Sequence, residues 1–108
     1  VVPASFSFAA GGDIGANSTT NASLTTLAGT GASFFLALGD LSYDQVTPES
    51  AWCSYVKQRV GATYPFELLV GNHEEKTSGP DGFIDNYAAC LPDRLGVTGQ
   101  YGHQYYFD

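Results

Sequence analysis

The strongest constraint on the fold is a pattern that occurs three times along the chain. Each time, a short apolar run ends at glycine and polar residues follow at once. The apolar runs cover residues 6–10, 34–38 and 66–70. Runs of this length that end at glycine are typical of buried strands. The pattern therefore predicts three buried strands, each followed by side chains that can bind a metal ion.

Helical signals lie between and after these runs. Thr47 followed by Pro48 is typical of a helix start, with the threonine as N-cap and the proline as the first helical residue. Gly61 marks the expected end of this helix. A shorter helix is expected over about residues 21–28, and another over about residues 83–91.

The alternation of strands and helices predicts an α/β fold with mainly parallel strands and crossover helices. Residues 103–107 are interpreted as a fourth strand. Ligands of parallel sheets bind beyond the carboxyl ends of the strands. We therefore expect the polar residues that follow the three runs to converge at one edge of the sheet. The candidate site residues are Asp13, Asp40, Tyr43, Asn72 and His73.

Two carboxylates, an amide oxygen, a phenol and an imidazole form an oxygen-rich set. Such a set suits hard or borderline cations, such as ferric iron, manganese, zinc or magnesium. Asp40, in the middle of the three clusters, could bridge two ions through its two oxygens. Other interpretations stay open: the aspartates could be helix caps, Asn72 could shape a turn, and Tyr43 and His73 could be structural. Glu74 is expected to support a ligand or to face solvent.

These residues resemble the first three motifs of the calcineurin-like metallophosphoesterases, in the variant found in purple acid phosphatases. The motifs are Gly12-Asp13-Ile14-Gly15, Gly39-Asp40-Leu41-Ser42-Tyr43 and Gly71-Asn72-His73-Glu74. Most of that superfamily has a histidine in place of Gly15, and the resemblance implies that Tyr43 replaces this lost ligand. It covers about residues 6–75, and it implies that residues 1–108 are the N-terminal half of a catalytic domain with a partial metallophosphoesterase sandwich.

The resemblance implies a centre of two metal ions, Fe(III) plus a divalent ion that is Zn, Mn or Fe. Asp13, Asp40 and Tyr43 would bind the first ion. Asp40 and Asn72 would bind part of the second. A phenolate is a hard anionic donor, which favours the trivalent ion. His73 would be the catalytic residue, in contact with the phosphate or donating a proton to the leaving oxygen.

The implied function is metal-dependent hydrolysis of phosphate monoesters, as in acid phosphatases. The alternatives are a phosphodiesterase or nucleotide pyrophosphatase of the same superfamily, and a non-catalytic metal-binding fragment. The family completes its centre with three histidines from two later motifs, which this sequence does not show. Tyr105 stands where the second histidine of one motif belongs, and we interpret His103 as structural. We therefore expect a second polypeptide segment to supply three His ligands, and residues 1–108 to be inactive alone.

Composition and charge limit the binding partners and the cellular compartment that we expect for this protein. A net charge of -7, with only 4 Lys and Arg, argues against binding to nucleic acid, and the chain has no long apolar span typical of a membrane protein. The expected partner is a phosphate ester substrate. Two cysteines and two sequons, at Asn17 and Asn21, indicate a secreted or otherwise exported protein, and the lack of methionine indicates a processed chain. Cys53 and Cys90 are expected to form a disulfide, with two buried free thiols as the alternative.

Overall fold

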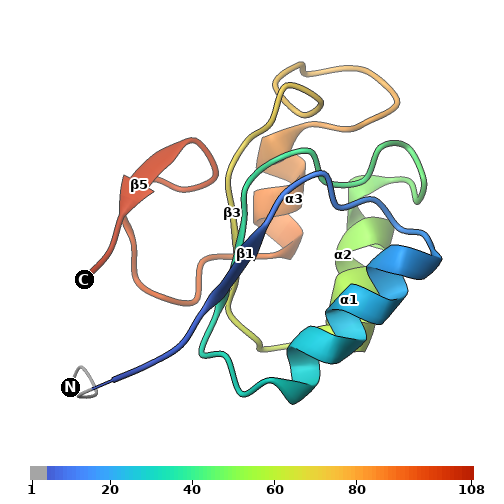
Figure 1. The fold of residues 1–108 in the computed structure, drawn as a ribbon. Helices are drawn as coiled ribbons and strands as arrows, with labels where there is room; N and C mark the ends of the chain where they lie inside the picture. The colour runs from blue at the N-terminus through green and yellow to red at the C-terminus, as the bar shows by residue number, and fades with distance from the viewer. Residues whose placement is uncertain (1–4) are drawn as a thin grey trace.

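The structure is a computed structural model, and it describes residues 5–108 of the chain. Strands and helices alternate up to the third helix, and a two-stranded hairpin follows (Figure 1). The elements are β1 (Ala9–Gly11), α1 (Ser18–Gly29), β2 (Phe35–Ala37), α2 (Glu49–Val60), β3 (Phe66–Leu68), α3 (Ile84–Cys90), β4 (Thr98–Gln100) and β5 (Gln104–Tyr106).

The central feature is a parallel sheet of three strands in the order β1-β2-β3. Phe35 of β2 pairs with Ala9 of β1 on one side and with Phe66 of β3 on the other. The three strands run in one direction, so the loops that leave them start from the same edge of the sheet. The predicted α/β fold, with parallel strands and crossover helices, is confirmed.

α1 begins three residues earlier than the sequence pattern predicted. Its N-cap is Asn17, whose side-chain oxygen accepts a hydrogen bond from the Thr20 amide at 3.1 Å. This contact satisfies one of the amides that the first turn of a helix leaves without a partner. The cap therefore sets the start of α1, and it occupies the asparagine of the first sequon.

α2 shows one correction to the prediction. Its N-cap is Pro48, and not the predicted Thr47. The amides of Ala51 and Trp52 both donate to the Pro48 carbonyl, at 2.9 and 3.3 Å. Thr47 therefore lies one residue outside the cap position, too far back for its hydroxyl to reach the first turn. The predicted end at Gly61 is confirmed, because the Gly61 amide closes the helix on the Lys57 carbonyl.

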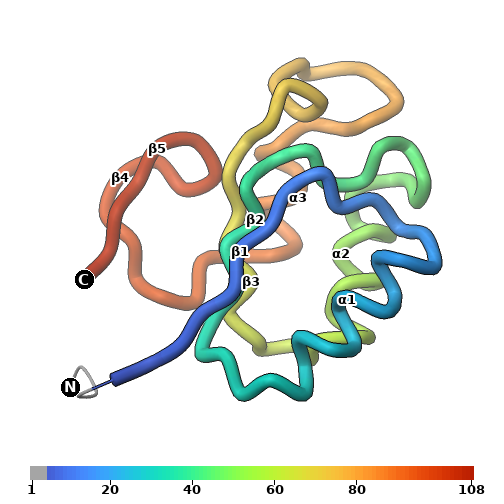
Figure 2. The backbone as a smooth tube through the Cα atoms, viewed as in Figure 1, coloured from blue at the N-terminus to red at the C-terminus, as the bar shows by residue number. Residues whose placement is uncertain are grey.

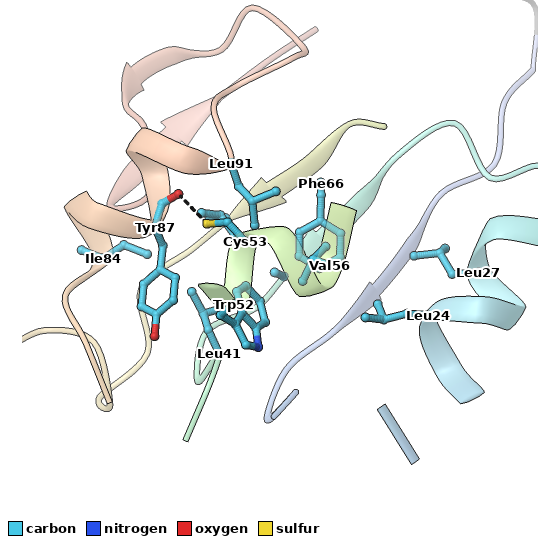
Figure 3. Packing of buried hydrophobic residues seen from close by; sticks show 12 residues of the cluster. Leu24, Leu27, Leu41, Trp52, Cys53, Val56, Phe66, Ile84, Tyr87 and Leu91 are labelled. Atoms are coloured by element: carbon cyan, nitrogen blue, oxygen red, sulfur yellow. Dashed lines mark hydrogen bonds between the residues drawn. The ribbon is translucent and has the colours of Figure 1, made fainter. Parts of the chain in front are cut away.

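One hydrophobic core fills the space between the sheet and the helices. Trp52 and Val56 of α2 are fully buried. The Trp52 ring meets Phe66 and Tyr87 edge-on, with centroids 6.2 and 5.5 Å apart. Figure 3 shows these side chains packed together, with α1 contributing two leucines. The other buried members are Leu24, Leu27, Ala37, Leu41, Cys53, Leu68, Ile84 and Leu91.

The chain after α3 differs from the prediction. Residues 104–106 do form a strand, but this strand, β5, pairs with β4 in an antiparallel hairpin and does not join the parallel sheet. The hairpin lies across the sheet from α1 and α2 (Figure 2). It closes the outer edge of β3, because the Val70 amide donates to the Gly102 carbonyl at 2.7 Å and the Tyr105 hydroxyl donates to the Leu68 carbonyl at 2.8 Å.

The face of the sheet opposite the helices is only partly covered. Side chains alternate between the two faces of a strand, and Ala9 packs against the helix core, so Phe8 points to the other face. There it stacks on Phe34 with ring centroids 5.0 Å apart. Phe6 and Phe8 are 55% and 52% exposed. The described residues therefore form a partial sandwich, with one layer of helices and an incomplete second layer.

Cys53 of α2 and Cys90 of α3 form a disulfide, with Cα atoms 5.9 Å apart. This confirms the predicted pairing. The bond closes a loop across a sequence separation of 37 residues and joins two helices of the core. Within the described residues, no helix has both the length and the apolar character needed to cross a membrane.

Replacing both cysteines with alanine should lower the free energy of unfolding by about 3 to 4 kcal/mol, because a bond that closes a loop of this size restricts the unfolded chain. Denaturant titration of the purified protein measures the change. The matched control is reduced wild-type protein, since alanine also removes a buried sulfur. Reduction alone should produce most of the loss, and a loss under about 1 kcal/mol would contradict a structural role for the bond.

Candidate metal centre

The loops that follow β1 and β2 run side by side beyond the end of the sheet. The Ile14 amide donates to the Asp40 carbonyl at 2.8 Å, one residue beyond a contact from the Asp13 amide to the Gly39 carbonyl at 3.2 Å. Asp13 and Asp40 both have left-handed backbone, with φ of 52° and 57°. Residues other than glycine rarely adopt this conformation, and it persists only where the surroundings hold it.

Neither aspartate is a helix cap, which was one of the open interpretations. The N-cap of α1 is Asn17, and the N-cap of α2 is Pro48. The loops place Asp13 and Asp40 before those helices begin, at the carboxyl end of the sheet. Neither aspartate side chain is therefore used to cap a helix, and each can contact the loop that carries the other.

Tyr43 joins the two aspartates. Its hydroxyl is in hydrogen-bond contact with Asp13 Oδ1, and it lies 3.2 Å from Asp40 Oδ2. Tyr43 is also in the left-handed region, with φ of 53°. The structure thus brings three of the sequence-predicted residues together, with the Tyr43 hydroxyl in contact with one carboxylate oxygen of each aspartate.

The hydrogen bond with Asp13 raises the pKa of Tyr43, and burial and the Asp40 carboxylate act in the same direction. The phenol therefore keeps its proton at neutral pH when only the carboxylates face it. A cation among these oxygens would have the opposite effect, because positive charge stabilises the phenolate. A bound cation would therefore compete with the Tyr43 proton for the phenol oxygen.

His73 lies against Tyr43 and Asp40. Its ring centroid is 4.4 Å from that of Tyr43, and its backbone amide donates to Asp40 Oδ1 at 3.3 Å. His73 Nδ1 is 3.0 Å from Asp81 Oδ2, and this contact raises the pKa of His73. No described residue is hydrogen-bonded to Nε2. The ring is therefore oriented by Asp81 through one nitrogen, while the other nitrogen stays available.

Glu74 is fully buried, with 0% of its side chain exposed, and holds two of the loops together. Its Oε1 accepts from the amides of Asp40 and Gly71, at 3.0 and 3.1 Å, and its Oε2 accepts from the Leu41 amide at 2.8 Å. Burial raises the pKa of Glu74, although the three amides act in the opposite direction. This carboxylate supports the loop that carries Asp40 and does not face solvent, so one of its two expected roles is excluded.

Two glycines allow the loops to approach this closely. A Cβ on Gly71 would lie 2.1 Å from Asp40 Oδ1, and a Cβ on Gly39 would lie 2.7 Å from the Gly71 Cα. Gly39 also has a positive φ of 94°. Only a residue without a side chain fits at either position. The glycines that end the second and third apolar runs are therefore required by the packing of the site itself.

The backbone conformation at residue 15 explains why a glycine occupies this position. Gly15 has a φ of 72°, and its carbonyl accepts a hydrogen bond from the buried Trp52 indole at 2.9 Å. A side chain here would be strained by the backbone and would meet the Gln45 side chain, whose oxygen lies 2.5 Å from the built Cβ. This loop conformation favours glycine over histidine, which leaves Tyr43 as the nearby side chain that supplies a third oxygen.

Asn72 stands apart from the cluster in its contacts. It follows Gly71 at the same end of β3 and is exposed, and no hydrogen bond to its side chain occurs within residues 5–108. Asn72 therefore lies between Gly71 and His73 along the chain, and no side-chain hydrogen bond joins it to Asp40 or His73.

The oxygens of Asp13, Asp40 and Tyr43 fit one hard cation, because two are carboxylates and the third is a phenol whose proton a cation can displace. Counting only His, Cys, Asp and Glu, residues 5–108 contain no group of three or more that could hold a metal ion. The donor set therefore depends on the phenol. A second ion would need donors besides Asp40 and Asn72.

No protein-family model, curated protein or solved structure matches this chain. The resemblance to the metallophosphoesterases therefore depends on the three motifs and on where the fold places them.

Asp81, the partner of His73, was not among the site residues predicted from the sequence. Asp81 lies in a loop between Pro80 and Gly82, and no periodicity there predicts a direction for its side chain. An acidic residue a short distance after a candidate histidine is a weak signal that could have identified it. Gln45, whose side-chain oxygen accepts from the Ala16 amide and so links the first two loops, has no sequence signal.

Changing Glu74→Gln should lower the free energy of unfolding by about 1 to 3 kcal/mol, because an amide offers one acceptor oxygen and turns its own N–H groups toward a backbone donor. Denaturant titration at neutral pH measures this loss. The matched control is Glu75→Gln, the exposed next residue, which should change stability by less than about 0.5 kcal/mol. Equal effects of the two variants would show that the buried contacts of Glu74 contribute nothing.

Proposed function

We propose that this chain is part of a metal-dependent hydrolase of phosphate monoesters, similar to an acid phosphatase, that works within a larger polypeptide or a nicked complex. The observation that carries the proposal is the meeting of oxygens from Asp13, Asp40 and Tyr43 at the carboxyl end of the parallel sheet. Left-handed backbone at all three residues supports it, because strain of this kind clusters at functional sites.

In this proposal Asp13, Asp40 and Tyr43 hold Fe(III), while Asp40 and Asn72 provide part of the site for a divalent Zn, Mn or Fe ion. Bound metal ions supply Lewis acidity, which activates water and neutralises the charge of a phosphate. The chain itself has little positive charge to offer, since it has 4 Lys and Arg against 11 Asp and Glu. The carboxylates and the phenol bind and orient the cations that a phosphate ester requires.

His73 is the proposed proton donor. Its Nδ1 contact with Asp81 fixes the ring, and its Nε2 is the atom that would give a proton to the leaving oxygen of the ester. Its ring lies against Tyr43, so a substrate bound at the metal centre would be within its reach. Asp81 acts through His73, and we assign it a positioning role.

A second polypeptide segment would supply the three His ligands that residues 1–108 lack in this proposal. The open face of the sheet, where Phe6 and Phe8 are more than half exposed, supports the need for such a segment. We also propose that the protein is exported, because disulfides persist in oxidising compartments.

The assay that tests this function compares an aryl phosphate monoester with the matching diester, on purified protein that contains this chain and its natural remainder. Monoester hydrolysis should dominate, fall at least about tenfold after chelation, and return when iron and a divalent ion are restored. Dominant diester hydrolysis would favour the phosphodiesterase alternative. Protein that holds no iron, zinc or manganese by elemental analysis would contradict catalysis and favour a non-catalytic fragment.

Changing Tyr43→Phe in the same protein should abolish the visible absorption of a phenolate bound to iron, because the variant has no oxygen to donate. Visible absorption spectroscopy measures the band, and elemental analysis measures the iron that remains. Tyr106→Phe is the matched control, since Tyr106 is 64% exposed and far along the chain in β5. A band that survives in the Tyr43 variant would show that another residue is the ligand.

A further inference from the structure

Glu67, in the middle of β3, is a buried carboxyl group outside the candidate metal centre. Its side chain has 0% exposure. Phe66 and Leu68, on either side of it, belong to the core beneath the helices, so Glu67 points to the opposite face of the sheet. The chain that follows α3 covers it there, because the Arg94 amide donates to Glu67 Oε1 at 2.8 Å.

The other oxygen of Glu67 is not satisfied. Oε2 is buried and has no hydrogen-bond partner within the described residues. An ionised carboxylate in this position is unfavourable, because it loses its water without full replacement by protein donors. A proton on Oε2 would remove the charge and turn the oxygen into a donor.

Two elements place titratable or charged groups against Glu67. The turn after α3 brings Asp93 and Arg94, and the β4–β5 hairpin brings the hydroxyls of Tyr101 and Tyr105. Among these, the Asp93 carboxylate is the acceptor suited to a proton on Glu67. The remaining charge is the Arg94 guanidinium, which favours ionised Glu67.

The surroundings of Glu67 and Asp93 shift the pKa values of the two carboxyl groups in opposite directions. Burial raises the pKa of Glu67 to about 7, and Asp93 adds to this increase against the opposing Arg94 amide. Burial also acts to raise the pKa of Asp93, but the amides of Leu95 and Val97, at 2.8 and 2.9 Å from its oxygens, outweigh it and lower that pKa. Asp93 is therefore the ionised member of the pair, and Glu67 is the member that carries the proton.

We propose that Glu67 and Asp93 form a proton-dependent latch that holds the chain after α3 against the parallel sheet. In the closed state, protonated Glu67 donates from Oε2 to Asp93 and accepts from the Arg94 amide through Oε1. When Glu67 loses its proton, its negative charge repels that of Asp93, and residues 93–106 hold β3 less tightly. The latch does not depend on the proposed enzymatic function.

The direction of the pH effect follows from the raised pKa. The folded state binds the Glu67 proton more tightly than the unfolded state, in which the carboxyl has its ordinary pKa of 4.5. The stabilisation is therefore complete below about pH 4.5 and is lost as the pH rises through about 7. The latch is closed in acid and weakened at alkaline pH.

Amide hydrogen exchange in the whole protein, measured between pH 5 and 8 and divided by the intrinsic rate at each pH, tests the latch. The amides of Arg94 and Val70 report on it, because they bond to Glu67 and to the Gly102 carbonyl. In the wild type their protection should fall by on the order of 100-fold across this range. In Glu67→Gln it should stay within about threefold, because glutamine keeps the acceptor for Arg94 and supplies an N–H donor for Asp93.

Glu75→Gln is the control for removing one negative charge, and it should keep the pH dependence of the wild type. Protection in the wild type that does not change with pH would overturn the proposal, and so would a full decrease in Glu67→Gln. A second measurement needs no variant: carboxyl titration of wild-type Glu67 by NMR should give a midpoint near 7, and a midpoint near its ordinary value of 4.5 would also overturn the latch.

Discussion

Three backbone amides that donate to the buried Glu74 carboxylate are the contacts on which the candidate centre depends. They come from the loops after β2 and β3, and one of them is the amide of Asp40 itself. Left-handed backbone at Asp40 is unfavourable without compensation, and the bond from its amide to Glu74 supplies part of that compensation. The same carboxylate holds Gly71 against Asp40, where no side chain fits. The position of the central aspartate is thus set by a buried residue that is not one of the proposed metal-binding side chains.

The two buried glutamates of this region differ in how many donors they meet. Glu74 receives three amide hydrogen bonds across both oxygens, so its charge is well supported for a buried group. Glu67 receives one, from Arg94, and its second oxygen has none in the described part of the chain. Burial is the same for both side chains. The number of satisfied oxygens therefore separates a carboxylate that fixes loops from one whose loss of a proton can loosen a contact.

Much of the framework could be predicted because it depends on local patterns. Apolar runs that end at glycine marked three strands, and the loops at one edge of a parallel sheet followed from their order. The first run was wrong in its start and its burial, because β1 begins only at Ala9 and none of its residues is buried. β4 could not be found in this way, since Thr98, Gly99 and Gln100 are all exposed and show no alternation. The position of β5 outside the parallel sheet also depends on contacts made far along the chain, at Leu68 and Val70.

The residues of the candidate site also divide into those that a local sequence pattern predicts and those that only the folded chain reveals. Asp13, Asp40 and Tyr43 were marked by their place after a strand, which a sequence reveals. Asp81 and Gln45 act through side-chain directions in irregular loops, and no pattern fixes those directions. The sequence shows Glu67 as a single acidic residue inside an apolar run, which conflicts with the apolar pattern of a buried strand. Its unsatisfied oxygen, however, appears only once the turn at Asp93 is folded over it.

The two edges of the parallel sheet differ in a way that bears on the proposed second segment. The outer edge of β3 is closed by the Gly102 carbonyl and the Tyr105 hydroxyl. β1 is the other end of the sheet, and within the described residues no strand pairs with its outer side. The exposed rings of Phe6 and Phe8 lie on the chain that leads into β1. Among the described residues, the outer side of β1 therefore has backbone groups without a strand partner and, next to them, exposed apolar rings. A segment that completes the centre would meet the sheet at β1, because it could pair with that backbone and cover those rings.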